Sequence, residues 1–286
     1  MAKSRPMSTV RHISFATRNF TRAARQLSST AKRFDINTYF YTVDHPAIAA
    51  LRQKHPKITS QARGAGYWLW KPAIILDALE RSEEGTIVLY TDAAMHMIAD
   101  PAPLLLHAMD HEVMLFEHRH ETYRQSDWTK RDCFILTGAD TPEHWNTRQC
   151  WAGVQVYRNS PRARDFVREL LDACSDERTI TDLPNTLGFP NLPGYVGHRH
   201  DQSLLTIVGR KHNVPHFRDP TQWGQMPSSP DLSDDVQRPL PNFSQTFYLH
   251  RKQDHAPLTK LMTLTGIKKV PWETAASYLS WPTHTD

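Results

Sequence analysis

The sequence predicts an α/β fold in which a mixed, mostly parallel central sheet is flanked by helices. Short apolar runs such as 87–90 alternate with amphipathic stretches, which is typical of strands that alternate with helices. The 286 residues are 39% hydrophobic and 22% charged, so the chain can bury a sizeable core and is too apolar to be disordered. We expect a single domain over 1–286, with its core at about 12–250 and a helical extension at 251–286.

Strand and helix signals follow one another through the first half of the chain. The apolar runs predict strands at 12–16, 38–43 and 87–90. A helix over 17–34 is indicated by Phe20, Ala24, Leu27, Ala31 and Phe34, which recur at helical spacing. Further helices are expected from 46, over 66–82 with a proline in the first turn, and after the Asp100-Pro101 pair.

The second half continues the same alternation and adds two long loops. Strands are expected at 113–116, 151–158 and 246–250, and helices at 161–174, from 201 and at 272–281. The loops at 181–198 and 219–243 are rich in proline. Loops of this length in a compact domain are often functional, so we expect them to form a lid on the acceptor side of a binding site, with a plain surface excursion as the alternative.

Composition and charge exclude several classes of protein. The net charge of +4 is mild and no basic block is dense, so nucleic acid is not an expected partner. Cys133, Cys150 and Cys174 are odd in number and far apart, which indicates a reducing compartment rather than a disulfide framework. A secretory signal and a membrane span are both missing from the sequence, so we expect a cytoplasmic protein, with peripheral contact to the inner membrane face left open for the last helix.

Two acidic positions carry the strongest signal for chemistry. Asp92 directly follows a strongly apolar strand, and the carboxyl ends of strands are where open α/β sheets bind ligands. Asp201 and Gln202 lie side by side before an apolar helix, where an acid can accept a proton and an amide can bind a sugar. For each position, a helix cap or turn residue is an equally good local interpretation.

Two further positions could bind a metal or a phosphate. His250 ends the last strand and could ligate a metal, although a structural histidine is the commoner case. Lys71 lies among aromatic residues in GYWLWKP and could hold a phosphate or sugar, or it could simply extend from an aromatic core.

Other classes of function remain as alternatives. The pairs His118/His120 and His198/His200 could grip zinc in a hydrolase, although H-E-x-x-H is missing. A non-catalytic carbohydrate-binding protein could use Trp68, Trp70 and Trp151. A sugar nucleotidyltransferase is a weaker option, because the usual glycine-rich, arginine-containing N-terminal loop is missing.

Taken in order, the segments GYWLWKP, LYTDA, WAGVQVYRNS, HRHDQS and YLHR resemble a family of bacterial glycosyltransferases. The family is of the GT-A, nucleotide-diphospho-sugar transferase type, and several members belong to polysaccharide or capsule gene clusters. The resemblance runs from about residue 12 to residue 250 and rests on the order and spacing of the segments. It implies transfer of a sugar from a nucleoside-diphosphate sugar, UDP-sugars being favoured, to a glycan or other hydroxyl in surface polysaccharide synthesis.

The resemblance also implies a divalent cation, Mn²⁺ or Mg²⁺. Asp92 matches the first acid of a D-x-D motif, and His250 matches a late metal-binding histidine. Ala94 stands in place of the second acid, so the donor diphosphate and water would have to complete the shell. His96 is a possible substitute ligand.

The remaining roles are also implied by the resemblance. The expected donor-binding residues are Thr17, Arg18, Arg22, Arg63, Lys71, Tyr90, Asp92 and Ala93. The expected wall of the acceptor side is Trp68, Trp151, Ala152, Gly153 and His200. Asp201 is the natural general base if the reaction inverts the anomeric centre, whereas Asp201 and Gln202 line the donor face if it retains. Both stereochemical outcomes and the oligomeric state stay open.

Overall fold

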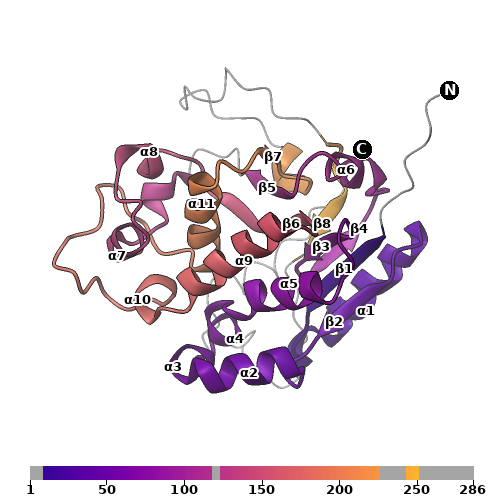
Figure 1. Cartoon of the computed structure of the whole chain (residues 1–286), viewed down its shortest axis with the longest axis horizontal. Coiled ribbons are helices and arrows are strands. Elements are labelled where there is room, and N and C mark those ends of the chain that lie inside the picture. Colours follow the sequence, from indigo (N-terminus) through magenta and orange to yellow (C-terminus); the bar gives the residue numbers. More distant parts are fainter. Residues whose placement is uncertain (1–8, 118–122, 226–242, 251–286) are drawn as a thin grey trace, which may run out of the picture.

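A six-stranded sheet with helices on both faces forms the centre of the protein (Figure 1). The computed structural model describes residues 9–117, 123–225 and 243–250. In the order β2-β1-β3-β6-β5-β7, the strands are β2 (Thr38–Tyr41), β1 (Val10–Phe15), β3 (Ile87–Thr91), β6 (Cys150–Arg158), β5 (Val113–Glu117) and β7 (His216–Arg218). Only β6 runs antiparallel to its neighbours in this sheet. The predicted α/β class with a mixed, mostly parallel sheet is therefore confirmed.

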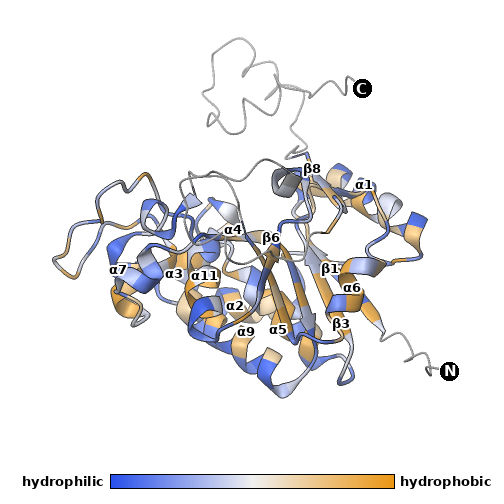
Figure 2. Cartoon of the chain, turned by 90° about the horizontal axis from the view of Figure 1, so that it is seen from above, coloured by the Kyte–Doolittle hydropathy of each residue, from blue (hydrophilic) through white to orange (hydrophobic). Residues whose placement is uncertain are grey.

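Each face of the sheet has its own hydrophobic core. Helices α2 (Pro46–Lys54), α5 (Trp70–Glu80), α9 (Pro161–Cys174) and α11 (Asp201–Lys211) contribute to one core. The other core contains α1 (Thr21–Ala31), α6 (Ala102–His107) and the small sheet of β4 (Met95–Met97) and β8 (Phe247–Leu249). Val88 and Tyr90 of β3 join the first core, and Ile87 and Leu89 join the second. Because a strand alternates its side chains, a continuous apolar run fills both faces of the sheet. Figure 2 shows the hydrophobic colour of β3.

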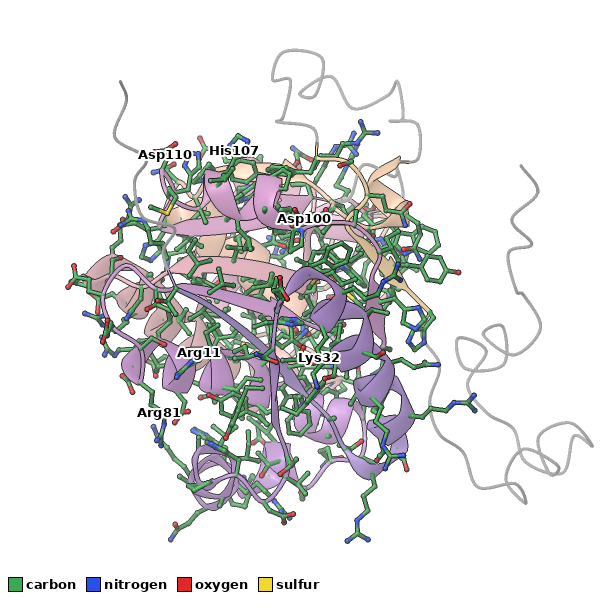
Figure 3. The ribbon with its side chains drawn as sticks, turned by 90° about the vertical axis from the view of Figure 1, so that its right-hand side faces the viewer. Arg11, Lys32, Arg81, Asp100, His107 and Asp110 are labelled. Carbon is green, nitrogen blue, oxygen red and sulfur yellow. The ribbon has the colours of Figure 1, made fainter. Side chains whose placement is uncertain are left out.

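Side-chain hydrogen bonds mark the start of some of the helices. Ser160 accepts a hydrogen bond from the Ala163 amide (3.1 Å) at the start of α9, as expected from the Ser-Pro pair. Asp100 accepts one from the Ala102 amide (2.9 Å) at the start of α6, and Figure 3 shows Asp100 at this end of the helix and His107 and Asp110 toward the other end. The shorter elements are η1 (Arg18–Phe20), η2 (Lys32–Phe34), α3 (Pro56–Thr59), α4 (Gly64–Tyr67), η4 (Gln125–Asp127), α7 (Arg131–Leu136), α8 (Pro142–Trp145), α10 (Glu177–Ile180) and η5 (Gln222–Gln225).

Several predicted elements need correction or lie elsewhere. The buried face of α1 consists of Ala23, Leu27 and Ala31, so the predicted Ala24 lies one position off that face. The helix expected over 66–82 begins only at Trp70, because Gly66, Tyr67 and Trp68 have left-handed backbone angles. The predicted helix at 272–281 and most of the loop at 219–243 lie outside the described residues. In the part of the chain that is described, no helix is long and apolar enough to cross a membrane.

A buried ionic cluster joins β5, β7 and α11. Oε1 of Glu117 accepts hydrogen bonds from Nδ1 of His216 and Nη2 of Arg210, both at 2.5 Å. Burial opposes protonation of His216, but its contacts with Cys150 and Glu117 raise the pKa of the imidazole to about 9. Burial likewise opposes ionisation of Glu117, but His216 and Arg210 lower the pKa of its carboxyl to about 2. Folding therefore favours the charged forms of both groups.

This cluster predicts a loss of stability on the alkaline side. Because the pKa of His216 is higher in the folded state, its contribution is complete below about pH 6.5 and is lost as the pH rises through about 9. We expect the free energy of unfolding to fall by about 1–3 kcal/mol across this window in urea titrations. The fall should be much smaller in His216→Gln and unchanged in the control His55→Gln. An equal fall in all three proteins would contradict the assignment.

Candidate functional site

Polar side chains gather at the edge of the sheet where β1 and β3 end and β6 begins. Asp92 directly follows β3, and its amide donates to the carbonyl of Gly153 (2.9 Å). Its side chain is 31% exposed, whereas all five residues of β3 are buried. The Tyr90 hydroxyl donates to Oδ1 of Asp92 at 2.6 Å. The acid at the end of the central strand thus lies at the carboxyl edge, as the sequence predicts, and is held there by neighbouring strands.

Lys71 joins this acid to the start of α11. Its Nζ lies 2.7 Å from Oδ2 of Asp201 and 3.6 Å from Oδ1 of Asp92, and it donates to the carbonyl of Ala152 at 3.2 Å. The lysine side chain is only 4% exposed. A buried ammonium requires such partners, because removing an ion from water costs several kcal/mol. One buried cation therefore links two carboxylates that lie 109 positions apart in the chain.

The three charges shift one another's protonation. Burial opposes the charge on Lys71, but Asp201 and Asp92 raise the pKa of its ammonium above the ordinary value. Burial raises the pKa of Asp201, and the ammonium of Lys71 opposes that rise. Burial also raises the pKa of Tyr90, and the carboxylate of Asp92 adds to the effect. Asp201 is therefore a carboxyl group that takes up a proton more readily than an exposed aspartate.

A left-handed turn sets the start of α5 and hence the position of Lys71. The residues from Gly64 to Trp68 all have positive φ angles, between 52° and 96°. At Gly66 a side chain is excluded as well, since a Cβ would lie 2.8 Å from the Cα of Thr59. Ala65, Tyr67 and Trp68 adopt angles that are costly for residues with a side chain. Strain of this kind persists only where the surrounding structure imposes it, which marks the turn as a candidate functional element.

A second strained segment, at His200, sets the position of Asp201. His200 has φ 53° and ψ −120°, a conformation that favours glycine. Its ring is 1% exposed and packs against the rings of Tyr67 and Trp68, with centroids 5.1 and 5.4 Å away. Asp201 follows as the first residue of α11. The two strained segments thus meet at the wall where the sequence analysis placed Trp68 and His200.

Gln202 faces the interior of the protein. Its Nε2 donates to Oε1 of Gln149 (2.8 Å), and the amide of Gln149 donates to the Ser203 hydroxyl at 3.1 Å. Gln202 is 7% exposed. The structure therefore gives Gln202 a role in holding the first turn of α11, and its predicted contact with substrate stays a prediction.

Arg63 contacts the long loop that follows α10. Its Nη1 lies 3.2 Å from Oδ2 of Asp182, to which the Tyr67 hydroxyl also donates at 3.1 Å. Nε2 of His200 is 3.4 Å from the other oxygen of this carboxylate. Asp182 thus ties the predicted lid loop to the strained turn and to His200. The expected contact between Arg63 and a donor phosphate would have to share the guanidinium with this ion pair.

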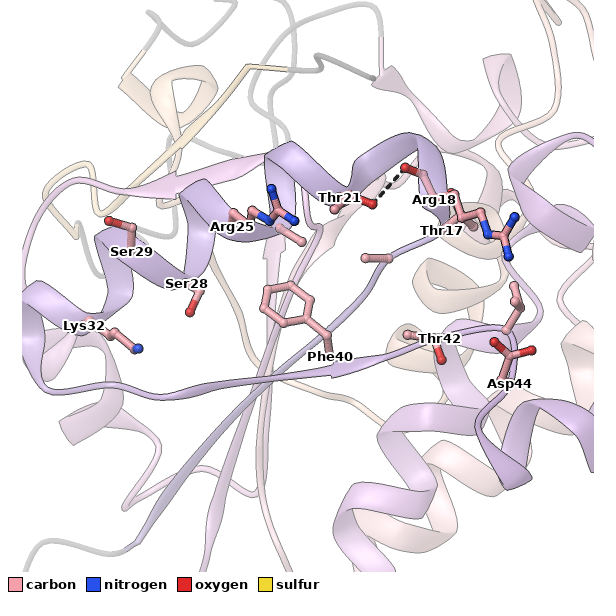
Figure 4. Close-up of a pocket in the computed structure, with 13 residues that line it drawn as sticks. Thr17, Arg18, Thr21, Arg25, Ser28, Ser29, Lys32, Phe40, Thr42 and Asp44 are labelled. Atoms are coloured by element: carbon pink, nitrogen blue, oxygen red, sulfur yellow. Dashed lines mark hydrogen bonds between the residues drawn. The ribbon is translucent and has the colours of Figure 1, made fainter. Parts of the chain in front are cut away.

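A groove runs along α1 beside the edge strand β2 (Figure 4). It has a volume of about 660 Å³, which is within the range of small-molecule sites. Three cationic residues line it at intervals of seven residues, namely Arg18 of η1, Arg25 of α1 and Lys32 of η2. Thr17, which follows the end of β1, also lines this groove, and Asp44 contributes a carboxylate to the lining. Two of the predicted donor residues, Thr17 and Arg18, therefore line the groove, whereas Arg22 does not.

Two residues of β6 that the sequence predicts on the acceptor-side wall, Ala152 and Gly153, contact the site through their backbone. The carbonyls of Ala152 and Gly153 accept from Lys71 and from the Asp92 amide, respectively. A Cβ at Gly153 would lie 2.6 Å from the ring of Trp151, so the glycine allows the indole to lie against the strand. Ala93 is buried at 5% exposure next to Asp92. The Ala-Gly step of the sequence thus lies against both Lys71 and Asp92.

The implied divalent cation is only partly matched by the side chains. The amide of His250 donates to the carbonyl of Ala94 (3.0 Å), and the rings of His250 and His96 are 4.7 Å apart. Among the described residues, however, no group of three or more His, Cys, Asp or Glu could hold a metal ion. Oδ1 of Asp92 is already bonded to Tyr90 and lies near Lys71. These side chains do not form a complete site, so Mn²⁺ or Mg²⁺ on Asp92 and His250 stays a prediction.

The alternative sites receive little support from the geometry. His198 is hydrogen-bonded through both ring nitrogens, to the Thr179 carbonyl and the Lys130 amide, and neither nitrogen is left for zinc. His118 and His120 lie outside the described residues. Trp70 is buried at 7% exposure and stacks on Phe15, so it offers no surface for a glycan.

Sequence reasoning missed three residues that help to build the site. Arg25 and Lys32 follow Arg18 at heptad spacing, a signal that was present in the sequence. Asp182, by contrast, shows no local pattern, because its partners Arg63, Tyr67 and His200 come from distant segments.

Comparison with known proteins gives a likeness in structure only. No family model matches the chain, and no curated protein matches it. Mouse xyloside xylosyltransferase 1 is similar with a TM-score of 0.43 and 13% identity, over 87% of this chain and 99% of that one. The bifunctional glycosyltransferase WbbM is similar with a TM-score of 0.47 and 12% identity, over 95% of this chain and 51% of that one.

The galactosyltransferase LgtC, solved with donor and acceptor sugar analogues, is similar with a TM-score of 0.42 and 15% identity. That likeness covers 93% of this chain and 99% of LgtC. At these scores, the resemblance describes a comparable course of the chain and assigns no activity.

The strain at His200 gives a testable order of stabilities. Glycine adopts the observed angles without a Cβ penalty, so we expect His200→Gly to be more stable than His200→Ala by about 1 kcal/mol in urea unfolding. At the exposed helical position Arg52 the order should reverse, with alanine more stable than glycine. Greater stability of the alanine variant at position 200 would show that the backbone there is unstrained.

Proposed function

We propose that this protein is a glycosyltransferase that moves a sugar from a nucleoside-diphosphate sugar to a hydroxyl group of an acceptor. The observation that carries this proposal is the pairing of Asp92 and Asp201 through Lys71 at the carboxyl edge of the sheet, close to the end of β1, where the groove opens. Open α/β sheets bind ligands at that edge. Carboxylates there can accept hydrogen bonds from sugar hydroxyls and a proton from an attacking hydroxyl.

The groove along α1 supports an anionic donor. Arg18, Arg25 and Lys32 give it three cations against the single carboxylate of Asp44. Such a groove attracts phosphate groups, and the carboxylate can accept hydrogen bonds from hydroxyls such as those of a ribose. The donor diphosphate would lie near Thr17 and Arg18, with the sugar toward Asp92. The predicted preference for uridine diphosphate belongs to this proposal.

Asp201 is proposed to act as the general base. The acceptor hydroxyl transfers its proton to the carboxylate of Asp201, and its oxygen forms a bond to the anomeric carbon. The bond from that carbon to the diphosphate breaks, and the nucleoside diphosphate leaves with the electron pair. Burial raises the pKa of Asp201, which makes the carboxylate a better proton acceptor. A glycan acceptor in bacterial surface polysaccharide synthesis is the substrate class that the sequence resemblance adds.

Nucleotide binding tests the donor half of the proposal. A nucleoside diphosphate that binds the folded protein should raise its melting temperature in a thermal-shift screen. Arg18→Gln should weaken the binding about tenfold, because a charged hydrogen bond to phosphate is lost. Arg33→Gln removes the same charge from η2, which follows α1, but Arg33 does not line the groove, so this variant should bind like the wild type. Absence of any nucleotide effect would contradict the proposal.

Turnover tests the role of Asp201. Asp201→Asn keeps the shape of the side chain but cannot accept the proton, so we expect the rate of sugar transfer to fall by about 10²–10⁴-fold. Calorimetry should give a donor Kd within about threefold of the wild type, because the base acts on the acceptor. An unchanged rate would place the base elsewhere.

A further inference from the structure

The ammonium of Lys71 is enclosed by groups of the protein itself. One of its contacts is a hydrogen bond, to the Ala152 carbonyl at 3.2 Å, and the other two are ion pairs, with Asp201 at 2.7 Å and with Asp92 at 3.6 Å. The rings of Tyr90 and Trp70 lie on its other sides, with centroids 5.4 and 5.8 Å from Nζ. An ammonium has three hydrogens to donate. Three protein oxygens therefore surround Nζ within 3.6 Å.

This enclosure separates Lys71 from the donor. Its side chain is 4% exposed, so a phosphate oxygen could reach Nζ only by displacing one of the carboxylates. Asp92, by contrast, is 31% exposed and is the member of the group that faces solvent. The carbonyl that receives Lys71 is itself fixed, because Gln155 also donates to it at 2.9 Å and is bonded in turn to the Tyr157 hydroxyl. The lysine is thus bound within a rigid, largely buried polar network.

Two carboxylates at one sheet edge repel each other unless a cation lies between them. Asp92 comes from the end of β3 and Asp201 from the start of α11, and Lys71 contacts both. We propose that Lys71 is a positioning residue, which holds Asp201 and Asp92 together for the transfer reaction and does not itself bind the donor phosphates. This role differs from the direct phosphate contact that the sequence resemblance implies, and it rests on the proposed function for the identity of the reaction.

The position of Lys71 in its helix agrees with this role. The lysine lies in the first turn of α5, where the helix dipole disfavours a positive charge. Asp201 lies at the corresponding end of α11, where the dipole favours a carboxylate. Two helix N-termini therefore converge on one carboxylate–ammonium pair, and the acid rather than the lysine gains from the dipoles. The lysine is retained at this unfavourable position by its partners.

The test compares Lys71→Met with Lys71→Arg and measures binding and turnover separately. The methionine keeps much of the volume of the side chain and removes its charge, whereas arginine keeps the charge. We expect Lys71→Met to lower kcat by at least 100-fold while the Kd for a nucleoside diphosphate changes by less than threefold. Lys71→Arg should recover part of kcat. A tenfold or greater loss of nucleotide affinity in Lys71→Met would overturn the proposal, because it would show a direct phosphate contact.

A stability cycle, which compares the melting temperatures of single and double variants, tests the proposal without a turnover assay. Lys71→Met leaves two carboxylates without their cation, so it should unfold at a lower temperature than the wild type. Adding Asp201→Asn removes one of those charges and should restore part of the lost melting temperature. The control is Lys130→Met, since Lys130 is equally buried but donates to the carbonyls of Thr181 and Leu183. Adding Asp201→Asn to Lys130→Met should not raise the melting temperature of that variant.

The outcomes separate the two proposals. Failure of Asp201→Asn to rescue Lys71→Met would overturn the positioning role, even if nucleotide binding and sugar transfer are found. A wild-type protein that binds no nucleotide would overturn the proposed function, while the stability cycle would still report on the pairing of Lys71 with Asp201.

Discussion

The buried ammonium of Lys71 is the interaction on which the rest of the site depends. It contacts Asp92 at the end of β3, Ala152 on β6 and Asp201 at the start of α11, so one ammonium links three elements of the fold. A charge this deeply buried is stable only when its partners are in place. The arrangement of the sheet edge and the ionisation of Asp92 and Asp201 therefore both depend on Lys71.

Two strained segments of the backbone position Lys71 and Asp201. The left-handed turn from Gly64 to Trp68 leads into α5 and presents Lys71, and the unusual angles of His200 lead into α11 and present Asp201. The rings of Tyr67 and Trp68 pack on His200, so each strained segment supports the other. Asp182 of the long loop after α10 also contacts this region, through Arg63 and Tyr67. Strain, burial and charge thus coincide at one place, which is typical of functional sites.

The sequence predicted what depends on local pattern and missed what depends on distant partners. The run at 87–90 indicated a buried strand followed by an acid at the carboxyl end of the sheet, and the structure has both. β4 and β7 have three residues each, too few for a periodic signal, and the antiparallel direction of β6 is not encoded in its apolar residues. The burial of Lys71 could not be predicted either, because its partners lie 21 and 130 positions away. The segment GAGYW shows no local pattern that predicts a left-handed turn including Ala65, Tyr67 and Trp68.

The central claim is that the carboxyl edge of the sheet, from Thr17 to Asp92, receives the diphosphate of an activated sugar. Its most direct test is a crystal structure of the protein with a bound nucleoside diphosphate. The account predicts phosphate density beside Thr17 and Arg18, with the nucleoside in the groove along α1 and Lys71 still bonded to Asp201. Nucleotide density at any other part of the molecule, or a phosphate bonded to Lys71 in place of Asp201, would contradict it.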